Sequence, residues 1–230
     1  AASEIQTGQN FCLSLPLDYP GGTVLNARRY PPNLSPTELN GEQWMNMSMG
    51  EHIRGATDVI CDDQVLICLQ YSTQWDSLAH VGSHFDADGD GEAEKVFYNG
   101  YRAGEHILGS DDHVQPGALN LSIDNFASNP IQGRGVLVDL YRHFGRERKA
   151  VDYDDLMMVM EKDGVVIEEG DILLLRTGFA EVILEMNLAP DKAVLDKSCA
   201  ALEGRDDRLL QWITDSGIGA ICADNYAVEN

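Results

Sequence analysis

Short aliphatic runs alternate with amphipathic segments through the second half of this 230-residue chain. The runs at 133–140 and 168–178 are rich in Val, Leu and Ile, the run at 219–224 consists mainly of Ala, Ile and Cys, and each run contains a glycine. Such runs are typical of strands that are buried on both faces of a parallel sheet. Because strands and helices follow one another in turn, we expect an α/β fold.

Two segments between the aliphatic runs carry the start and stop signals of helices. We expect helices at 152–162 and 206–216. Each opens on an Asp that can cap its first turn, and each ends just before a glycine, Gly164 or Gly217. The side chains expected to face the core are Leu156, Val159, Met160, Leu209, Leu210 and Ile213.

The rest of the chain gives weaker signals of organisation. No internal repeat, low-complexity tract or charged linker divides it, so we expect a single domain over 1–230. The first 50 residues hold clusters of Gly, Pro and Asn with little periodicity, which predicts an irregular N-terminal arm over about 1–50. Residues 58–71 contain two apolar stretches separated by Asp62 and Asp63, which predicts two strands and a turn.

The composition excludes several classes of partner. The chain has 38 Asp and Glu against 16 Lys and Arg, a formal net charge of −22 at pH 7. Such a charge repels phosphates and anionic lipids, so we expect neither nucleic acid nor membrane as a partner. The first residues show no basic stretch followed by an apolar run, so we expect a cytoplasmic protein. The five cysteines are widely spaced and mostly lie in apolar stretches, which predicts buried free thiols.

An acid and an imidazole lie four residues apart just after an apolar run. Asp76 and His80 follow the predicted strands of 58–71, and strand ends that open into loops are where α/β enzymes place reactive groups. A carboxylate can bind a metal or fix the tautomer of a nearby histidine. By composition alone the pair is therefore either a metal or acid–base site, or a hydrogen-bonded structural Asp beside an ordinary His.

The stretch TQWDSLAH at 73–80 resembles the signature H-x-G-T-H-x-D-x-P-x-H of the cyclase family. These metal-dependent hydrolases are related to bacterial kynurenine formamidase. Asp76 and His80 fall on the Asp and the last His of the signature. QWDSLAHV followed by FYNG at 97–100 is similar to a longer-chain subgroup of the family. The resemblance implies the swivelling β/β/α domain of the cyclase family.

The chain departs from the signature at its metal ligands. Gln70 and Gln74 stand where the family has histidines, and Leu78 stands where it has proline. The resemblance still implies a divalent metal, Mn²⁺ or Zn²⁺, on Asp76 and His80, with the two glutamines as oxygen ligands. Glutamine is a poorer ligand for Zn²⁺ than imidazole is. The family also supplies a His and a Glu from beyond the strand that ends at Asp224, and we expect that C-terminal segment to be missing here.

The function implied by the resemblance is hydrolysis of an amide or lactone bond in a small cyclic or aromatic molecule. His80 and Asp76 would be catalytic, and Trp75, Tyr98 and Asn99 would contact the small-molecule substrate. Two alternatives stay open: a non-catalytic binding or scaffolding protein on a cyclase fold, and a metal-independent enzyme that uses Asp76 and His80. Family members are commonly homo-oligomers, and the Gly- and Pro-rich arm at 16–45 is expected to pack across a subunit boundary.

A second register of the signature is also possible. His80, His84 and Asp86 have the spacing H-x-G-S-H-x-D by themselves, which would make them the metal ligands. We rank this register second because it leaves Asp90 at the position of the last histidine.

The same stretch contains the first half of a calcium loop. Residues 86–91 read D-x-D-x-D-G, the pattern of the first six positions of an EF-hand. The twelfth position is Phe97, where an EF-hand needs a glutamate, so we expect a structural Ca²⁺ site or a metal-free acidic turn. The candidate ligands are Asp86, Asp88, Asp90 and Glu94.

Overall fold

The structure is a computed structural model that describes residues 2–112 and 115–229. The chain forms two compact units, which are described separately. The larger unit contains residues 2–73 and the segment from Gly133 onward, and the smaller unit runs from Gln74 to Gln132. The expectation of a single domain stays a prediction.

The larger unit holds most of the regular structure. Its 3₁₀ helices are η1 (Ala2–Glu4) and η2 (Met49–Glu51). Its α-helices are α2 (Leu140–Phe144), α3 (Tyr153–Asp163), α4 (Phe179–Glu185), α5 (Lys192–Leu195) and α6 (Asp207–Ser216). Its strands are β1 (Asn33–Pro36), β2 (Glu38–Leu39), β3 (Glu42–Gln43), β4 (Met47–Ser48), β5 (Val59–Ile60), β6 (Asp63–Leu66), β11 (Gly135–Asp139), β12 (Lys149–Val151), β13 (Ile172–Arg176), β14 (Ala200–Leu202) and β15 (Ala220–Ala223).

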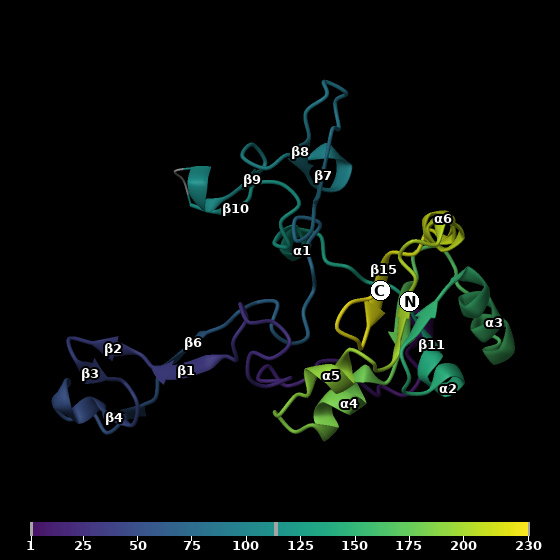
Figure 1. The fold of residues 1–230 in the computed structure, drawn as a ribbon. Helices are drawn as coiled ribbons and strands as arrows, with labels where there is room; N and C mark the ends of the chain where they lie inside the picture. Colours follow the sequence, from purple (N-terminus) through teal and green to yellow (C-terminus); the bar gives the residue numbers. More distant parts are fainter. Residues whose placement is uncertain (1, 113–114, 230) are drawn as a thin grey trace. The chain divides into compact units, whose positions relative to one another are not determined.

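A parallel three-stranded sheet in the order β11-β13-β15 forms the centre of the larger unit. Helices α2, α3 and α6 lie around it in Figure 1, and β12 pairs in parallel with β14. One core joins the sheet, the β12–β14 pair, α3 and α6. Its fully buried members include Val138, Leu156, Leu173 and Leu209. The mixed α/β class predicted from the alternation is therefore confirmed, while the swivelling arrangement stays a prediction.

Both helices predicted from their capping residues are confirmed, as α3 and α6. Asp152 accepts a hydrogen bond from the N–H of Asp155, and α3 ends at Gly164 in the left-handed conformation. Asp206 accepts from the N–H groups of Arg208 and Leu209 at the start of α6, which ends at Gly217. These bonds satisfy N–H groups that a helix start would otherwise leave unpaired.

Two expectations about burial are wrong. Leu210 is 44% exposed, because only one stripe of α6 packs against the core. That stripe includes Leu209, and Leu210, the next residue, faces the solvent. Strand β11 is not buried on both faces: Leu137 is 54% exposed, whereas Val138 is fully buried. The physical reason is that Leu137 lies on the face of the sheet opposite Val138, away from the main core, and that β11, at the edge of the sheet, has a neighbouring strand on one side only.

The N-terminal arm is only partly irregular. Residues Leu15, Tyr19 and Leu25 pack against a second small core formed by α4, α5 and Cys199. Beyond them, strands β1 to β6 form three antiparallel pairs, β1–β6, β2–β3 and β4–β5. The two strands expected in 58–71 are present as β5 and β6, and each pairs with a strand of the arm rather than with the other.

The smaller unit is built from short elements. They are β7 (Ser83–Phe85), β8 (Glu94–Val96), η3 (Tyr98–Gly100), β9 (Ile107–Leu108), η4 (Ser110–Asp112), β10 (Gly117–Ala118) and α1 (Asn125–Ser128). Strand β7 pairs with β8, and β9 pairs with β10, both antiparallel. In the described parts of the chain, no helix is long and apolar enough to cross a bilayer.

Candidate functional site

Asp76 and His80 lie together in the irregular segment that opens the smaller unit. A turn that begins at Ser77 folds the chain back: the Ser77 carbonyl oxygen accepts from the His80 N–H at 3.0 Å, and the Ser77 Oγ accepts from the Ala79 N–H at 3.2 Å. The turn brings His80 Nε2 to 3.9 Å from Asp76 Oδ1. The four-residue spacing read from the sequence thus produces a spatial pair.

A third side chain completes this group. Gln74 Nε2 donates a hydrogen bond to the same Oδ1 of Asp76, at 3.2 Å. One carboxylate oxygen therefore faces an amide N–H on one side and an imidazole nitrogen on the other. The Asp76 side chain is half exposed and that of His80 is less exposed, so water reaches both groups. The arrangement places an imidazole beside a carboxylate, two groups that can take part in proton transfer.

This arrangement does not fit a bound metal ion. Gln74 presents an amide nitrogen to Asp76, and an amide N–H is a donor that cannot ligate a cation. His80 Nε2 and Asp76 Oδ1 are 3.9 Å apart, a separation that two ligands of one ion can have, but among the described residues no third His, Cys, Asp or Glu joins them in such a group. A catalytic zinc site normally has three protein ligands that converge on one point. We therefore derive no catalytic step through a metal at Asp76, and the expected Mn²⁺ or Zn²⁺ stays a prediction.

Gln70, the other expected oxygen ligand, belongs to the larger unit. Its backbone carbonyl accepts a hydrogen bond from Arg29 Nη1 at 2.7 Å. Next to it, the Tyr71 hydroxyl donates to the Gly22 carbonyl at 2.8 Å and the Ser72 hydroxyl donates to the Pro16 carbonyl at 2.9 Å. The N-terminal arm thus fixes the segment that leads into the site.

Trp75, predicted to contact substrate, makes an aromatic contact. Its ring packs edge-on against Phe126 of α1, with ring centroids 5.2 Å apart and an interplanar angle of 78°. Phe126 was not identified from the sequence, because its partner lies about 50 residues earlier and neither residue belongs to a shared motif. Tyr98 and Asn99 lie in η3, where Asn99 has a left-handed φ of 56°. Within the described residues, neither side chain hydrogen-bonds to Asp76 or His80.

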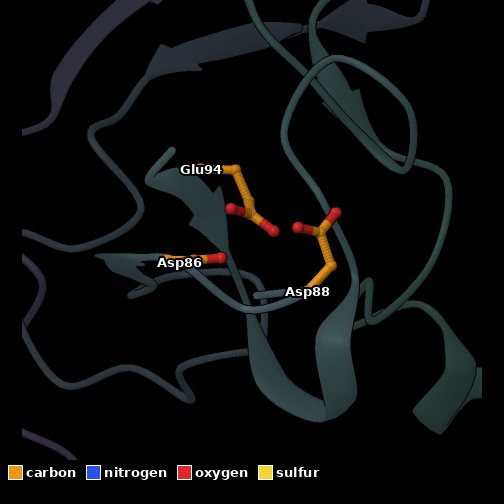
Figure 2. A group of neighbouring side chains, drawn as sticks. All are labelled: Asp86, Asp88 and Glu94. Atoms are coloured by element: carbon orange, nitrogen blue, oxygen red, sulfur yellow. The ribbon is translucent and has the colours of Figure 1, made fainter. Parts of the chain in front are cut away.

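The acidic loop between β7 and β8 brings three of the four expected calcium ligands together. Carboxylate oxygens of Asp86, Asp88 and Glu94 lie within 4.8 Å of one another, as Figure 2 shows for the three side chains. Such a group fits a divalent cation. Asp90 is not part of it, and its Oδ1 instead accepts the Glu92 N–H at 2.8 Å.

The same loop already has a cation from the protein itself. Arg102 Nη2 lies 2.9 Å from Asp88 Oδ2 and 3.0 Å from Glu94 Oε1. Its hydrogen bond to Asp88 lowers the pKa of that carboxyl. The sequence held no signal for Arg102, because it lies outside the D-x-D-x-D-G pattern and reaches the loop only through the fold.

The alternative register of the signature is not brought together. His84 lies in β7 with Nε2 3.1 Å from the Ala93 carbonyl oxygen. Asp86 closes the acidic loop by accepting from the N–H groups of Gly89 and Gly91. Among the residues that the structure describes, the only group of three potential ligands is Asp86, Asp88 and Glu94, so His80, His84 and Asp86 do not form one.

Comparison with known proteins identifies the family. A solved structure described as the crystal structure of a novel cyclase is 28% identical, with a TM-score of 0.71 over 100% of this chain and 70% of that chain. Isatin hydrolase A from Labrenzia aggregata, solved with bound benzyl benzoate, is 12% identical, with a TM-score of 0.48 over 96% of this chain and 65% of that chain. None of the curated proteins matches. The family model named Cyclase matches residues 13–230, and the chain therefore belongs to the cyclase family.

Proposed function

We propose that this protein is a hydrolase that opens an amide or lactone bond in a small cyclic or aromatic molecule, with Asp76 and His80 as its acid–base pair. Membership of the cyclase family supports an enzyme of this kind. The observation that carries the residue roles is the shared Oδ1 of Asp76, which faces both Gln74 Nε2 and His80 Nε2.

In the proposed reaction, His80 takes a proton from a water molecule as the water oxygen attacks the carbonyl carbon. The imidazolium that forms lies beside the Asp76 carboxylate, which stabilises its charge. Gln74 holds that carboxylate through its N–H. His80 then returns the proton to the leaving nitrogen or oxygen as the C–N or C–O bond breaks, so water is the only co-substrate.

Substitution of the pair tests this proposal. His80→Gln removes the proton acceptor, and we expect kcat/KM to fall by roughly 10²- to 10⁴-fold. The measurement is aniline release from formanilide, together with ring opening of a lactone. Asp76→Asn should also lower kcat/KM, because the imidazolium loses its counter-charge.

His84→Gln is the matched control, since His84 faces the Ala93 carbonyl rather than Asp76. We expect its turnover to match the parent. Unchanged turnover in His80→Gln would contradict the proposal, and loss in His84→Gln alone would favour the second register. Binding of these compounds without turnover would identify a binding protein on a cyclase fold.

The metal-dependent form of the same reaction is the second candidate. It is favoured by the positions of Asp76 and His80, which fall on the Asp and last His of the cyclase signature. An ion there would polarise the carbonyl and lower the pKa of bound water. For it to bind, Gln74 would have to exchange its N–H for its Oε1. Metal content of the purified protein and the effect of a chelator on turnover separate the two forms.

A further inference from the structure

Residues 70–73, which directly precede Gln74, are held by hydrogen bonds from one part of the N-terminal arm. Each residue of 70–73 bonds to a residue of the arm segment 15–29, which we call the latch. The four bonds run from Arg29 Nη1 to the Gln70 carbonyl (2.7 Å), from the Tyr71 hydroxyl to the Gly22 carbonyl (2.8 Å), from the Ser72 hydroxyl to the Pro16 carbonyl (2.9 Å) and from the Leu15 N–H to Thr73 Oγ1 (2.9 Å). The structure describes all of 70–73 and places no helix or strand there, so the bonds to the latch hold this segment in place of a helix or strand ladder.

The latch is itself fixed to the rest of the larger unit. Leu15, Tyr19 and Leu25 pack against the second small core, beside α4 and α5. Gly21 is buried and has a φ of +97°, and a Cβ added there would collide with the backbone of Leu188, in the loop between α4 and α5. Glycine suits both this backbone conformation and this close approach. The latch is therefore a fixed base for the segment that it holds.

The last bond of the latch lies directly before the proposed acid–base pair. Thr73 is followed by Gln74, and the peptide group between them is planar. A Thr73 held by Leu15 therefore restricts the direction in which the chain enters Gln74. A side chain on a restricted backbone loses less conformational freedom when it forms a hydrogen bond, which favours the bond from Gln74 Nε2 to Asp76 Oδ1.

We propose that Thr73 is a positioning residue: held by the N–H of Leu15, it keeps Gln74 in place, so that Gln74 Nε2 stays on Asp76 Oδ1 while His80 transfers the proton. The proposal rests on the function proposed above for Asp76 and His80. It gives the latch a role in turnover and assigns Thr73 no part in proton transfer itself.

Substitution of Thr73 tests this role. Thr73→Val keeps the shape of the side chain and removes the oxygen that accepts from Leu15. We expect kcat for formanilide to fall roughly 3- to 10-fold with KM unchanged, the effect of one lost hydrogen bond. Thr73→Ser keeps the hydroxyl and is expected to restore the kcat of the parent. Thr7→Val is the matched control, because Thr7 Oγ1 also accepts a backbone N–H, from Gln9 at 3.4 Å, but lies outside the latch.

A double-mutant cycle tests whether Thr73 acts through Gln74. Gln74→Ala removes the N–H that holds Asp76, and we expect it to lower kcat by itself. In the Gln74→Ala background, Thr73→Val should have no further effect on kcat. A general loosening of the fold would instead add the same loss in both backgrounds.

Hydrogen exchange of the Leu15 N–H, measured by NMR, tests the latch without turnover. We expect exchange to be faster in Thr73→Val than in the parent, and unchanged in Thr73→Ser and Thr7→Val. Equal exchange in the parent and Thr73→Val, unchanged kcat in Thr73→Val, or equal losses in both backgrounds of the cycle would overturn the role of Thr73 and leave the acid–base pair standing. Turnover that does not require His80 would overturn both proposals.

Discussion

At the scale of single residues, the charge of one arginine neutralises the carboxylates of the acidic loop between β7 and β8. Arg102 sits between two of the three clustered carboxylates, at 2.9 Å from Asp88 and 3.0 Å from Glu94. A guanidinium and a divalent cation would compete for the same oxygens, because both interact with carboxylates at short range. The loop is therefore stabilised without a metal, and a calcium ion would have to displace Arg102.

Removal of Arg102 is expected to strengthen calcium binding by the loop. Arg102→Gln takes away the competing charge, and we expect the Ca²⁺ dissociation constant to fall by about tenfold or more, the equivalent of roughly 1.4 kcal/mol. Isothermal titration with calcium chloride measures it. Arg142→Gln, whose partner is Asp163 in the larger unit, controls for the general change in net charge. Equal or weaker binding in Arg102→Gln would show that Arg102 does not compete with a cation for these oxygens.

At the scale of elements, local signals and long-range contacts differ in what the sequence reveals. The caps and glycine stops of α3 and α6 are local, so their bounds could be predicted. The exposure of Leu137 could not, because it depends on β11 lying at the edge of the sheet. The same division holds in the site: the Asp76–His80 spacing is local, whereas Phe126 and Arg102 reach their partners through the fold.

The turn from β13 into α4 gives a prediction at this scale. Gly178 has a φ of +83°, and a Cβ there would collide with the ring of Tyr141. Its N–H also donates to Asp224 at 2.9 Å, which ties the turn to the end of β15. We expect Gly178→Ala to lower the free energy of unfolding by about 2 kcal/mol or more, from the left-handed backbone and the overpacking together.

Gly164→Ala is the matched control for Gly178→Ala. Gly164 has a φ of +65°, and a Cβ added there would meet nothing within 4 Å, so only the backbone cost of about 1 kcal/mol applies. Urea unfolding of both variants measures the difference. Equal losses in the two variants would mean that the Tyr141 contact does not constrain this turn.

At the scale of the whole molecule, 38 acidic side chains outnumber 16 basic ones, and several of the basic ones make specific ion pairs. Arg134 makes two hydrogen bonds to Asp171, at 3.0 and 2.7 Å, and joins the start of β11 to the start of β13. Asp171 is only 3% exposed. The Arg134 hydrogen bond, followed by the N–H of Glu168, lowers the pKa of this carboxyl.

The exposed apolar side chains of the arm, such as Phe11 and Leu34, support the proposal that the protein is a homo-oligomer.

The Asp171 pair predicts a pH dependence of stability. Because its pKa is lower in the folded than in the unfolded chain, its contribution is present above about pH 4 and is lost as the pH falls through the folded value. Asp171→Asn should therefore destabilise the protein at neutral pH, and the difference from the parent should shrink on acidification. Glu168→Gln, at the exposed carboxylate 3.6 Å from Arg134, should show a much smaller difference. A constant difference across the range would contradict the role of this pair.

Hydrolysis by Asp76 and His80 without a metal is tested most directly by treating the intact protein with a chelator. The measurement is kcat/KM for formanilide before and after dialysis against the chelator, with metal content determined in both samples. We predict equal turnover in the two samples, whereas His80→Gln and Asp76→Asn lower turnover with or without the chelator. Loss of turnover on chelation, restored by Mn²⁺ or Zn²⁺, would contradict this prediction and establish the metal-dependent form.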